Sequence, residues 1–243
     1  MNVFFMIALM LLPVAARAEE VLVAVAANFT SPMEKIAIEF KRDTGHTVSA
    51  SYGSTGKFYT QIVNGAPFEV LLAADEEHPD KLLSAGFAQS KTDFIYAIGK
   101  LVLWSPKSNF VDSQGEVLSA KNFKHLSIAS PKLAPYGAAA EEALQNLGLW
   151  KKLEEKLIYG DSISQAHQFV VSGNAEIGML SLSQVKSAKG SLWIVPQNLY
   201  RPLRQKAVLL KAGQEKKAAE AFLEFLKSEK ARGIIQDFGY ERN

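Results

Sequence analysis

The sequence predicts an α/β fold in which two doubly wound α/β lobes enclose a ligand cleft. Apolar runs of strand length alternate with helix-like segments, a pattern typical of βα units and a mainly parallel sheet. Two segments, 97–100 and 196–204, indicate crossings between lobes, because Gly99 interrupts one strand-like run and a stretch rich in Pro, Asn and Arg separates two others. Lobe 1 is therefore expected to contain residues 19–98 and 204–243, and lobe 2 residues 99–203.

The predicted helices and strands alternate along the whole mature chain. Apolar side chains between Met33 and Phe40 recur at helical spacing, and Gly45 ends that helix. Similar stripes predict a helix that ends at Gly148 and another near the C-terminus. The strand-like runs are Val21–Ala26, Thr47–Tyr52, Glu69–Ala73, Ile95–Trp104, Leu126–Ala129, Leu157–Tyr159, Ile177–Leu180, Leu192–Val195 and Ala207–Leu210.

The composition excludes several classes of function. The chain has 243 residues, with 27 Lys+Arg against 25 Asp+Glu, and a formal charge of +2. This near balance provides no basic field for nucleic acid and no polybasic patch for a membrane. The absence of Cys excludes disulfides, thiolate zinc sites, a cysteine nucleophile and a lipidated cysteine anchor.

The N-terminus predicts export. Residues Val3–Ala16 are almost continuously apolar, and Ala16-Arg17-Ala18 has the small-x-small form of a signal-peptidase site. The run is shorter than the roughly 20 residues that a transmembrane helix needs. We therefore expect residues 1–18 to be a cleaved signal peptide rather than a retained anchor. The mature protein is expected to begin at Glu19 and to be a soluble monomer in the periplasm.

Four predicted strand-to-helix turns, two in each lobe, carry small and polar residues. In the first, Asn28 precedes a helix start in which Ser31 is the expected N-cap, Pro32 the first helical residue and Glu34 the capping-box partner. Free N–H groups at such helix starts are donors for an anion, although each turn can equally serve capping alone. The other turns are Gly53–Lys57, Pro135–Gly137 and Gly160–Ser164, which open helices expected over 58–63, 138–147 and as far as Val171.

Three other chemistries fit these segments less well. The turn Gly53–Lys57 lacks the first glycine of a P-loop, and Phe58 stands where a Ser or Thr should follow the lysine. No His or Asp arrangement marks Ser54 as a nucleophile. The run Asp75–His78 suits the first turn of a helix better than a metal site, because consecutive residues there do not converge on one ion. We therefore expect no enzymatic activity, no cofactor and no directly coordinated metal.

The mature chain also contains five characteristic segments in order. They are VAVAANFTSPMEKIAIEF, YGSTGKFYTQIVNGAPFEVLLAAD, SPKLAPYGAAAEEALQNLGLW, GDSISQAHQFVVSGNAEIGMLSLSQV and FLKSEKARGIIQDFGY. Together they resemble the periplasmic molybdate-binding proteins of ABC importers, the ModA family, over essentially the whole mature chain. The resemblance implies a type II periplasmic binding-protein fold. Such a protein closes on molybdate or tungstate and delivers the oxyanion to an ABC permease with its cytoplasmic ATPase.

The resemblance also implies the ligand contacts of lobe 1. The family's first contact, a Ser or Asn after the opening Ala-Ala, falls on Asn28, and the neighbouring backbone N–H belongs to Ala27 or Phe29. The serine of the second turn falls on Ser54, with Thr55 alongside.

In lobe 2 the resemblance implies three further contacts. The residue after the proline of the third turn is Tyr136, and the aliphatic residue that donates its N–H in the fourth turn is Ile163. Some family members have a tyrosine where this chain has Ser181, and Tyr136 is expected to take its place. Ser181 is kept as a candidate contact.

A site without ion pairs is expected for such a ligand. Each helix N-terminus acts as roughly half a positive charge, so four of them approach the charge needed by a dianion. Lys57 is expected near the mouth of the cleft, and Asp161 is expected to face its own helix N-terminus. Two alternatives stay open: a binder of another small oxyanion such as sulfate, and a secreted serine hydrolase that uses Ser54.

Overall fold

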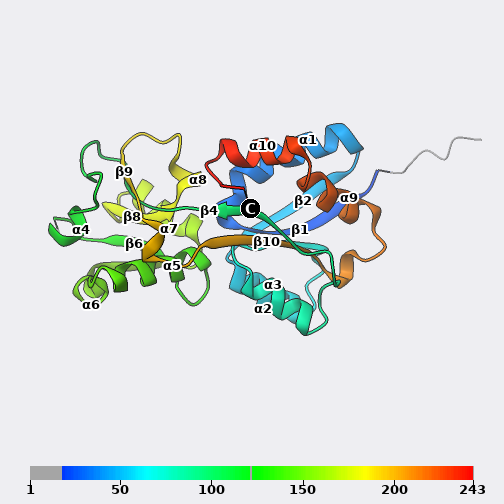
Figure 1. Ribbon diagram of the computed structural model, residues 1–243, viewed down its shortest axis with the longest axis horizontal. Helices are drawn as coiled ribbons and strands as arrows, with labels where there is room; N and C mark the ends of the chain where they lie inside the picture. The colour runs from blue at the N-terminus through cyan, green and yellow to red at the C-terminus, as the bar shows by residue number, and fades with distance from the viewer. Residues whose placement is uncertain (1–17, 121, 243) are drawn as a thin grey trace, which may run out of the picture.

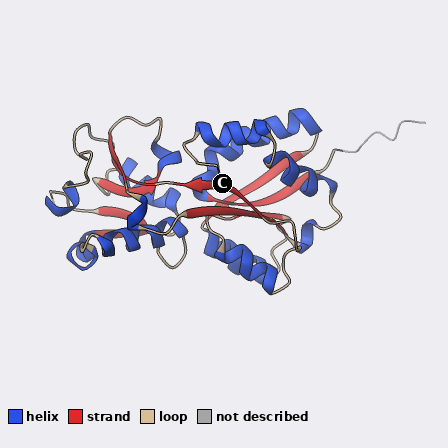
Figure 2. Cartoon of the chain, viewed as in Figure 1, coloured by secondary structure: helices blue, strands red, loops and turns tan. Residues whose placement is uncertain are grey.

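The computed structural model describes residues 18–120 and 122–242, and its strands form two five-stranded sheets flanked by helices (Figures 1 and 2). Figure 1 shows the sheets in two bodies that lie side by side along the long axis. We call the body that contains the N-terminal strand lobe 1 and the other lobe 2. The predicted α/β class with two lobes is confirmed. The predicted signal peptide, residues 1–18, lies outside the described residues except for Ala18.

Lobe 1 has the strand order β2-β1-β3-β10-β4, and helices cover both faces of its sheet. Its strands are β1 (Glu20–Ala26), β2 (Thr47–Gly53), β3 (Val70–Leu72), β4 (Phe94–Gly99) and β10 (Leu203–Leu209). Its helices are α1 (Thr30–Thr44), α2 (Thr55–Val63), α3 (Glu77–Ser84), α9 (Lys217–Leu226) and α10 (Glu229–Asp237), with single 3-10 turns η1 (Ala27–Phe29) and η4 (Lys211–Gly213).

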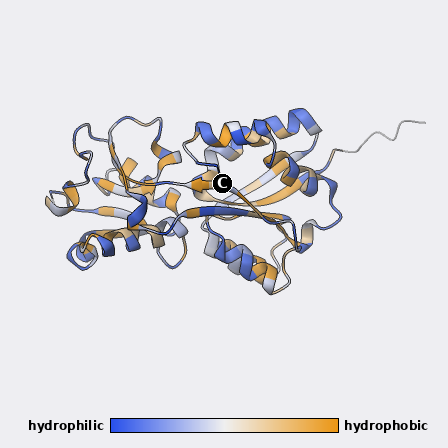
Figure 3. Ribbon diagram, viewed as in Figure 1, coloured by the Kyte–Doolittle hydropathy of each residue, from blue (hydrophilic) through white to orange (hydrophobic). Residues whose placement is uncertain are grey.

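The side chains of β1 explain why both faces of this sheet are covered. Successive strand residues point to opposite faces. Val23 and Val25 are fully buried in one cluster with Phe40 of α1, whereas Ala24 lies in a second cluster with Phe58 of α2. In Figure 3, α1 and α10 are largely hydrophilic, whereas β1 is largely hydrophobic.

Lobe 2 has the strand order β7-β6-β8-β5-β9. Its strands are β5 (Leu101–Ser105), β6 (Leu126–Ala129), β7 (Leu157–Gly160), β8 (Ile177–Ser181) and β9 (Ser191–Ile194). Its helices are α4 (Val117–Ala120), α5 (Pro135–Asn146), α6 (Trp150–Leu153), α7 (Ile163–Val171) and α8 (Leu182–Val185), with 3-10 turns η2 (Glu154–Lys156) and η3 (Gln197–Leu199). Its apolar core includes Ala26, Ala27 and Ala74 of lobe 1, so the two lobes pack directly against each other.

The chain crosses between the lobes in an extended conformation. β4 ends at Gly99 and β5 begins at Leu101, so the predicted run Ile95–Trp104 contains two strands of different sheets joined by Lys100. Strands that enter a sheet by this route need no helical crossover, and β5 and β10 run antiparallel to their neighbours. Each sheet therefore has two parallel and two antiparallel pairs, and the expectation of a mainly parallel sheet is wrong.

The other predicted strands all overlap strands of the structure. The lobe boundaries at residues 98/99 and 203/204 stay a prediction, although the sheets change close to them. In the described part of the chain, no helix combines the length and apolar character that spanning a bilayer requires.

Candidate ligand-binding site

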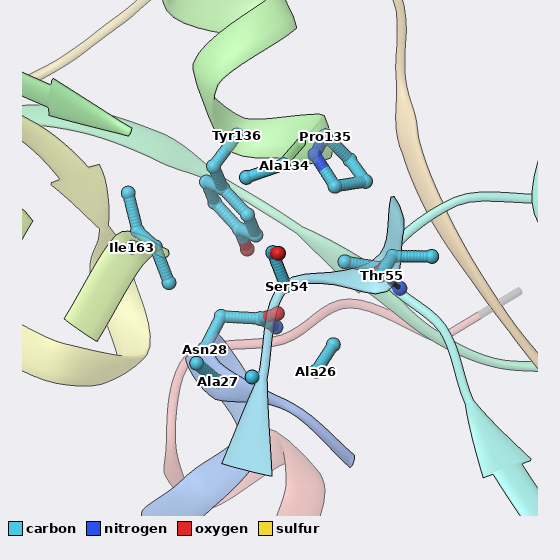
Figure 4. A pocket seen from close by; sticks show the side chains of 11 residues that line it. Ala26, Ala27, Asn28, Ser54, Thr55, Ala134, Pro135, Tyr136 and Ile163 are labelled. Carbon is cyan, nitrogen blue, oxygen red and sulfur yellow. Dashed lines mark hydrogen bonds between the residues drawn. The ribbon is translucent and has the colours of Figure 1, made fainter. Parts of the chain in front are cut away.

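A small cavity lies between the lobes, where four strand-to-helix turns meet (Figure 4). The space inside it that a water-sized sphere can occupy is only about 10 Å³, far below the roughly 300–1,000 Å³ of sites for drug-sized ligands. Such a cavity is too small for a sugar or a peptide. Its lining residues are Ala26, Ala27, Asn28, Gly53, Ser54, Thr55, Ala74, Ala134, Pro135, Tyr136 and Ile163.

The first turn differs from its predicted form. The chain leaves β1 through η1 and enters α1 at Thr30, whose hydroxyl donates to Ala27 O at 2.9 Å. Ser31 is therefore inside the helix and exposed, and the predicted capping box of Ser31 and Glu34 is wrong. The 3-10 turn replaces the side-chain cap and brings Ala27 and Asn28 into the cavity wall.

The side-chain amide of Asn28 is bonded to other protein groups rather than left free to donate into the cavity. Its Nδ2 donates to Gln205 Oε1 at 2.9 Å and to Tyr240 Oη at 2.8 Å, so both amide hydrogens have partners. Unpaired backbone N–H groups of the first turn are then the donors that this turn offers.

The second turn presents a buried hydroxyl to the cavity. Ser54 precedes α2 and is 3% exposed, and its Oγ has no hydrogen-bond partner in the described chain. Thr55 Oγ1 accepts from the backbone N–H of Ala74 at 3.0 Å, which ties α2 to the end of β3. A buried hydroxyl without a partner is rare because it loses its bonds to water. Ser54 Oγ is therefore a group whose partner is missing.

The two turns of lobe 2 complete the wall. α5 begins at Pro135, earlier than expected, so Tyr136 lies in its first turn and is 1% exposed. α7 begins at Ile163, and Ser162 is its N-cap, accepting from Gln165 N at 3.3 Å. Burial raises the pKa of Tyr136 well above its usual range, so the phenol keeps its hydrogen as a donor.

The cavity is electrically favourable to an anion without a cationic side chain. None of the described lining residues is charged, whereas the helix starts at α1 (through η1), α2, α5 and α7 all supply residues to the wall. Each start carries roughly half a positive charge. Lys57 does not reach the cavity wall but forms an ion pair with Asp161 at 2.7 Å. Asp161 thus faces the other lobe, and the expectation that it faces its own helix is wrong.

The lobes meet beside this ion pair at a backbone contact. Gly56 N–H in α2 donates to Leu133 O of lobe 2 at 3.0 Å. A Cβ on residue 56 would lie 2.9 Å from Leu133 O, so only glycine permits this approach. We call these four residues, Gly56, Lys57, Leu133 and Asp161, the outer rim.

Behind the cavity, buried polar side chains connect the lobes in what we call the inner network. It includes residues of β4, α5, β8, β10 and the C-terminal segment, and its bonds are 2.7–3.3 Å long. Its members are Asn28, Tyr96, Tyr136, Ser181, Ser183, Gln205 and Tyr240.

The structure brings most of the predicted contacts together but not all. Ala27, Asn28, Ser54, Thr55, Tyr136 and Ile163 line the cavity. The side chain of Phe29 lies in the core of lobe 1 against Tyr96 and Tyr240, and the expected contact through its backbone N–H stays a prediction. Ser181 lies one hydrogen bond behind Tyr136.

Sequence reasoning missed five lining residues. Gly53 and Pro135 lie within the predicted turns but were not named as contacts, and Ala26 and Ala134 lie one residue outside a predicted contact or turn. Ala74 follows β3, and its place depends on Thr55, which no sequence pattern indicated. No sequence pattern indicated that Gln205 and Tyr240 belong to the inner network.

The acidic run of lobe 1 serves local structure. Asp75 Oδ1 accepts from His78 N at 3.1 Å, and Asp75 Oδ2 lies 2.7 Å from His78 Nδ1. Across residues 18–120 and 122–242, no group of three or more His, Asp or Glu side chains is arranged to hold a metal ion.

Two α/β lobes that enclose a small, uncharged and donor-lined cavity define a protein that captures a small solute. The chain matches the family model of bacterial extracellular solute-binding proteins over residues 21–241 and belongs to that family.

The relatives within this family are more specific. The chain is 56% identical over 234 residues to the molybdate-binding protein ModA of Azotobacter vinelandii, with 95% of this chain and 93% of that protein covered. It is 52% identical over 230 residues to the molybdate-binding protein ModA of Rhodobacter capsulatus, with 94% and 91% covered. A solved periplasmic molybdate-binding protein of Azotobacter vinelandii superimposes with a TM-score of 0.89 at 43% identity, covering 92% of this chain and 99% of that one.

Proposed function

We propose that this chain is the solute-binding component of an ABC importer and captures molybdate or tungstate in the periplasm. It delivers the oxyanion to a membrane permease with its cytoplasmic ATPase, and it acts as a monomer whose mature form begins at Glu19. It performs no chemical reaction on its ligand. The molybdenum stays bound to its own oxygens, which accept hydrogen bonds from the protein.

The observation that carries the proposal is the unpartnered hydroxyl of Ser54. It is buried in the cavity wall beside the helix starts, where an anion oxygen would supply the missing acceptor. Hydrogen bonds to a charged acceptor contribute about 1.5–3 kcal/mol each. The helix starts favour negative charge, and none of the described residues that line the cavity carries a negative charge that would repel a dianion.

The donors also determine which oxyanion fits. Phosphate keeps a proton at neutral pH and therefore needs an acceptor in the site, whereas molybdate, tungstate and sulfate are fully deprotonated. Ser54 Oγ, Tyr136 Oη and the backbone N–H groups at the helix starts are all able to donate, and the nearby carboxylate of Asp161 is paired with Lys57. Sulfate has the right charge but is smaller, so it cannot reach all the donors at once.

The serine hydrolase alternative has no support in the site. Its nucleophile would be Ser54, but no His, Asp or Glu is among the described residues that line the cavity. A hydroxyl without an adjacent base is a poor nucleophile. Another small oxyanion, such as sulfate, remains the second candidate because it shares the charge that the site favours.

Calorimetric titration of the mature protein with molybdate, tungstate, sulfate and phosphate tests the proposal. We expect molybdate and tungstate to bind comparably and to exceed sulfate by at least about a hundredfold, which requires only about 2.8 kcal/mol. Phosphate is expected to bind weakly. Equal affinity for sulfate, or tighter binding of phosphate, would reduce the protein to a generic oxyanion binder.

A further inference from the structure

Gln205 has a fixed orientation behind the cavity. It lies on β10 and is fully buried, and its Oε1 accepts from Asn28 Nδ2 at 2.9 Å and from Tyr96 Oη at 3.0 Å. Its Nε2 is therefore turned toward Tyr136 Oη, 3.3 Å away. Gly99 makes room for this approach, because a Cβ there would lie 2.1 Å from Tyr136 Oη.

Both acceptor lone pairs of the Tyr136 hydroxyl can then be occupied by donors. A phenolic oxygen has one hydrogen and two acceptor lone pairs. Gln205 Nε2 takes one lone pair, and Ser181 Oγ, at 3.1 Å, is placed to take the other. When both donate, the hydrogen of Tyr136 has no partner left behind the cavity and must be donated into it.

Whether Ser181 donates depends on its other neighbour. Ser181 has one hydrogen but two partners, Tyr136 Oη and Ser183 Oγ, the latter at 2.7 Å. Ser181 can donate to Tyr136 only if Ser183 donates to Ser181. Ser183 has its own competing acceptor, Asn28 O at 2.8 Å in the other lobe.

Tyr240 decides this competition. Its Oη lies 2.9 Å from Asn28 O and 3.0 Å from Ser183 Oγ, and its single hydrogen can be donated to either. A buried carbonyl needs at least one donor. When Tyr240 donates to Asn28 O, that carbonyl is satisfied and the hydrogen of Ser183 is free to point to Ser181. Burial raises the pKa of Tyr240 to about 12, so it carries this hydrogen at every physiological pH.

We propose that Tyr240, Ser183 and Ser181 are positioning residues that direct the Tyr136 hydrogen into the cavity. Tyr240 occupies the Asn28 carbonyl, Ser183 donates to Ser181, and Ser181 donates to Tyr136, which donates to the bound oxyanion. This inference rests on the proposed function. Tyr240, Ser183 and Ser181 are not among the described cavity-lining residues, and they contact two residues that are, Tyr136 and Asn28.

The same geometry predicts what removal of the Tyr240 hydroxyl does. In Tyr240→Phe, Ser183 must turn to Asn28 O, Ser181 then donates to Ser183, and the hydrogen of Tyr136 turns back to Ser181. The oxyanion loses a donor although no lining residue has changed. Hydrogen bonds in an aligned series of hydroxyl groups strengthen one another, so the reversal affects every bond from Ser183 to Tyr136.

A double-mutant cycle measured by calorimetry with molybdate tests this directly. Tyr136→Phe is expected to weaken binding about tenfold or more, and Tyr240→Phe about fivefold or more. In the Tyr136→Phe background, Tyr240→Phe should change the affinity by less than about twofold, because the hydrogen that it controls is gone. A purely structural role of Tyr240 would give the same loss in both backgrounds and would overturn the proposal, as would wild-type affinity in Tyr240→Phe.

A suppressor supplies a second readout with the opposite sign. In the Tyr240→Phe background, Ser181→Ala removes the acceptor that captures the Tyr136 hydrogen and should restore molybdate affinity. Further weakening instead of recovery would overturn the proposal. The matched control is Ser105→Ala. It removes a fully buried hydroxyl of lobe 2 that donates to Glu176 O at 2.8 Å and does not belong to the inner network. It should lower the thermal midpoint without changing the affinity.

If Tyr240→Phe does not fold, Ser181→Ala alone still tests the arrangement. It frees a lone pair of Tyr136, which can then accept the proton of hydrogen phosphate, so the preference for molybdate over phosphate should narrow about tenfold. An unchanged preference would overturn the proposal. Failure of the wild type to bind any oxyanion would overturn the proposed function itself, whereas wild-type binding with unresponsive variants overturns the positioning role alone.

Discussion

The inner network and the outer rim both connect the lobes, but they do so with opposite chemistry. The inner network is uncharged and almost completely buried, and each of its bonds has a direction set by which atom carries the hydrogen. The outer rim contains an ion pair whose side chains are 46% and 66% exposed. Exposed pairs are weakened by water and salt. The comparison indicates that affinity is determined inside the cleft and that the ion pair contributes little to it.

The outer rim has a second component that charge does not control. Gly56 N–H and Leu133 O approach each other across the lobes through backbone atoms alone. How closely the lobes approach there is therefore limited by sterics rather than by electrostatics. Substitutions of Ser54, Gly56 and Lys57 distinguish the contributions of a buried donor, a steric contact and an exposed ion pair to the affinity.

Ser54→Ala is expected to have the largest effect. It removes a buried donor that water cannot replace, so oxyanion affinity should fall by about 1.5–3 kcal/mol, or about 10- to 150-fold. Because Ser54 Oγ has no hydrogen-bond partner among residues 18–120 and 122–242, the stability of the ligand-free protein should change little. Calorimetry with molybdate and thermal unfolding without ligand measure the two effects.

The matched control for this variant is Ser51→Ala, an exposed serine on the preceding strand β2. It should leave the affinity unchanged. Equal affinities of Ser54→Ala and the wild type would show that the cavity is not the binding site. The difference drawn between the inside of the cleft and the outer rim would then be wrong.

Gly56→Ala is expected to have an intermediate effect with an unusual signature. The added Cβ would lie 2.9 Å from Leu133 O and should hold the lobes slightly apart, which costs about 1–2 kcal/mol of affinity. The proposed closure on the ligand implies that the ligand-free lobes separate, and replacing glycine by alanine in a helix stabilises by about 0.5–1 kcal/mol. Weaker binding should therefore accompany equal or higher stability of the ligand-free protein.

Gly233→Ala is the control for this pair of effects. Gly233 lies in α10, and a Cβ there would meet nothing within 4 Å. It should give the stabilisation without the loss of affinity. If Gly56→Ala binds like Gly233→Ala, closure does not require the contact with Leu133.

The sequence was sufficient for the architecture and for the position of the turns. The apolar run Val21–Ala26 predicted the strand that the structure shows as β1. The turns that hold Ser54 and Tyr136 were located because each precedes or opens a predicted helix, and the resemblance to molybdate-binding proteins singled out the two residues. Local patterns are enough for features of this kind.

Features that depend on distant residues could not be predicted. Asp161 turns toward Lys57, a residue 104 positions away, because closure of the lobes places the two together. Tyr240 reaches Asn28 across 212 positions, and nothing in the segment around Tyr240 indicates that contact. The Ser-Pro-Met-Glu pattern predicted a helix start at Ser31. That prediction was wrong because the 3-10 turn η1 leads directly into α1, which begins at Thr30.

The exposed ion pair is expected to have the smallest effect of the three. Lys57→Met removes the charge that pairs with Asp161 but keeps most of the apolar stem, so the affinity for molybdate should fall by less than about 1 kcal/mol. The small difference from the wild type should shrink further as the salt concentration rises, because salt screens exposed pairs. Titrations at low and high ionic strength measure both quantities. Lys81→Met is the matched control, since Lys81 pairs with Glu77 within α3 and does not connect the lobes. A Lys57→Met loss as large as that of Ser54→Ala, and insensitive to salt, would mean that the lysine is the counter-ion of the ligand and that the outer rim, not the buried donors, determines affinity.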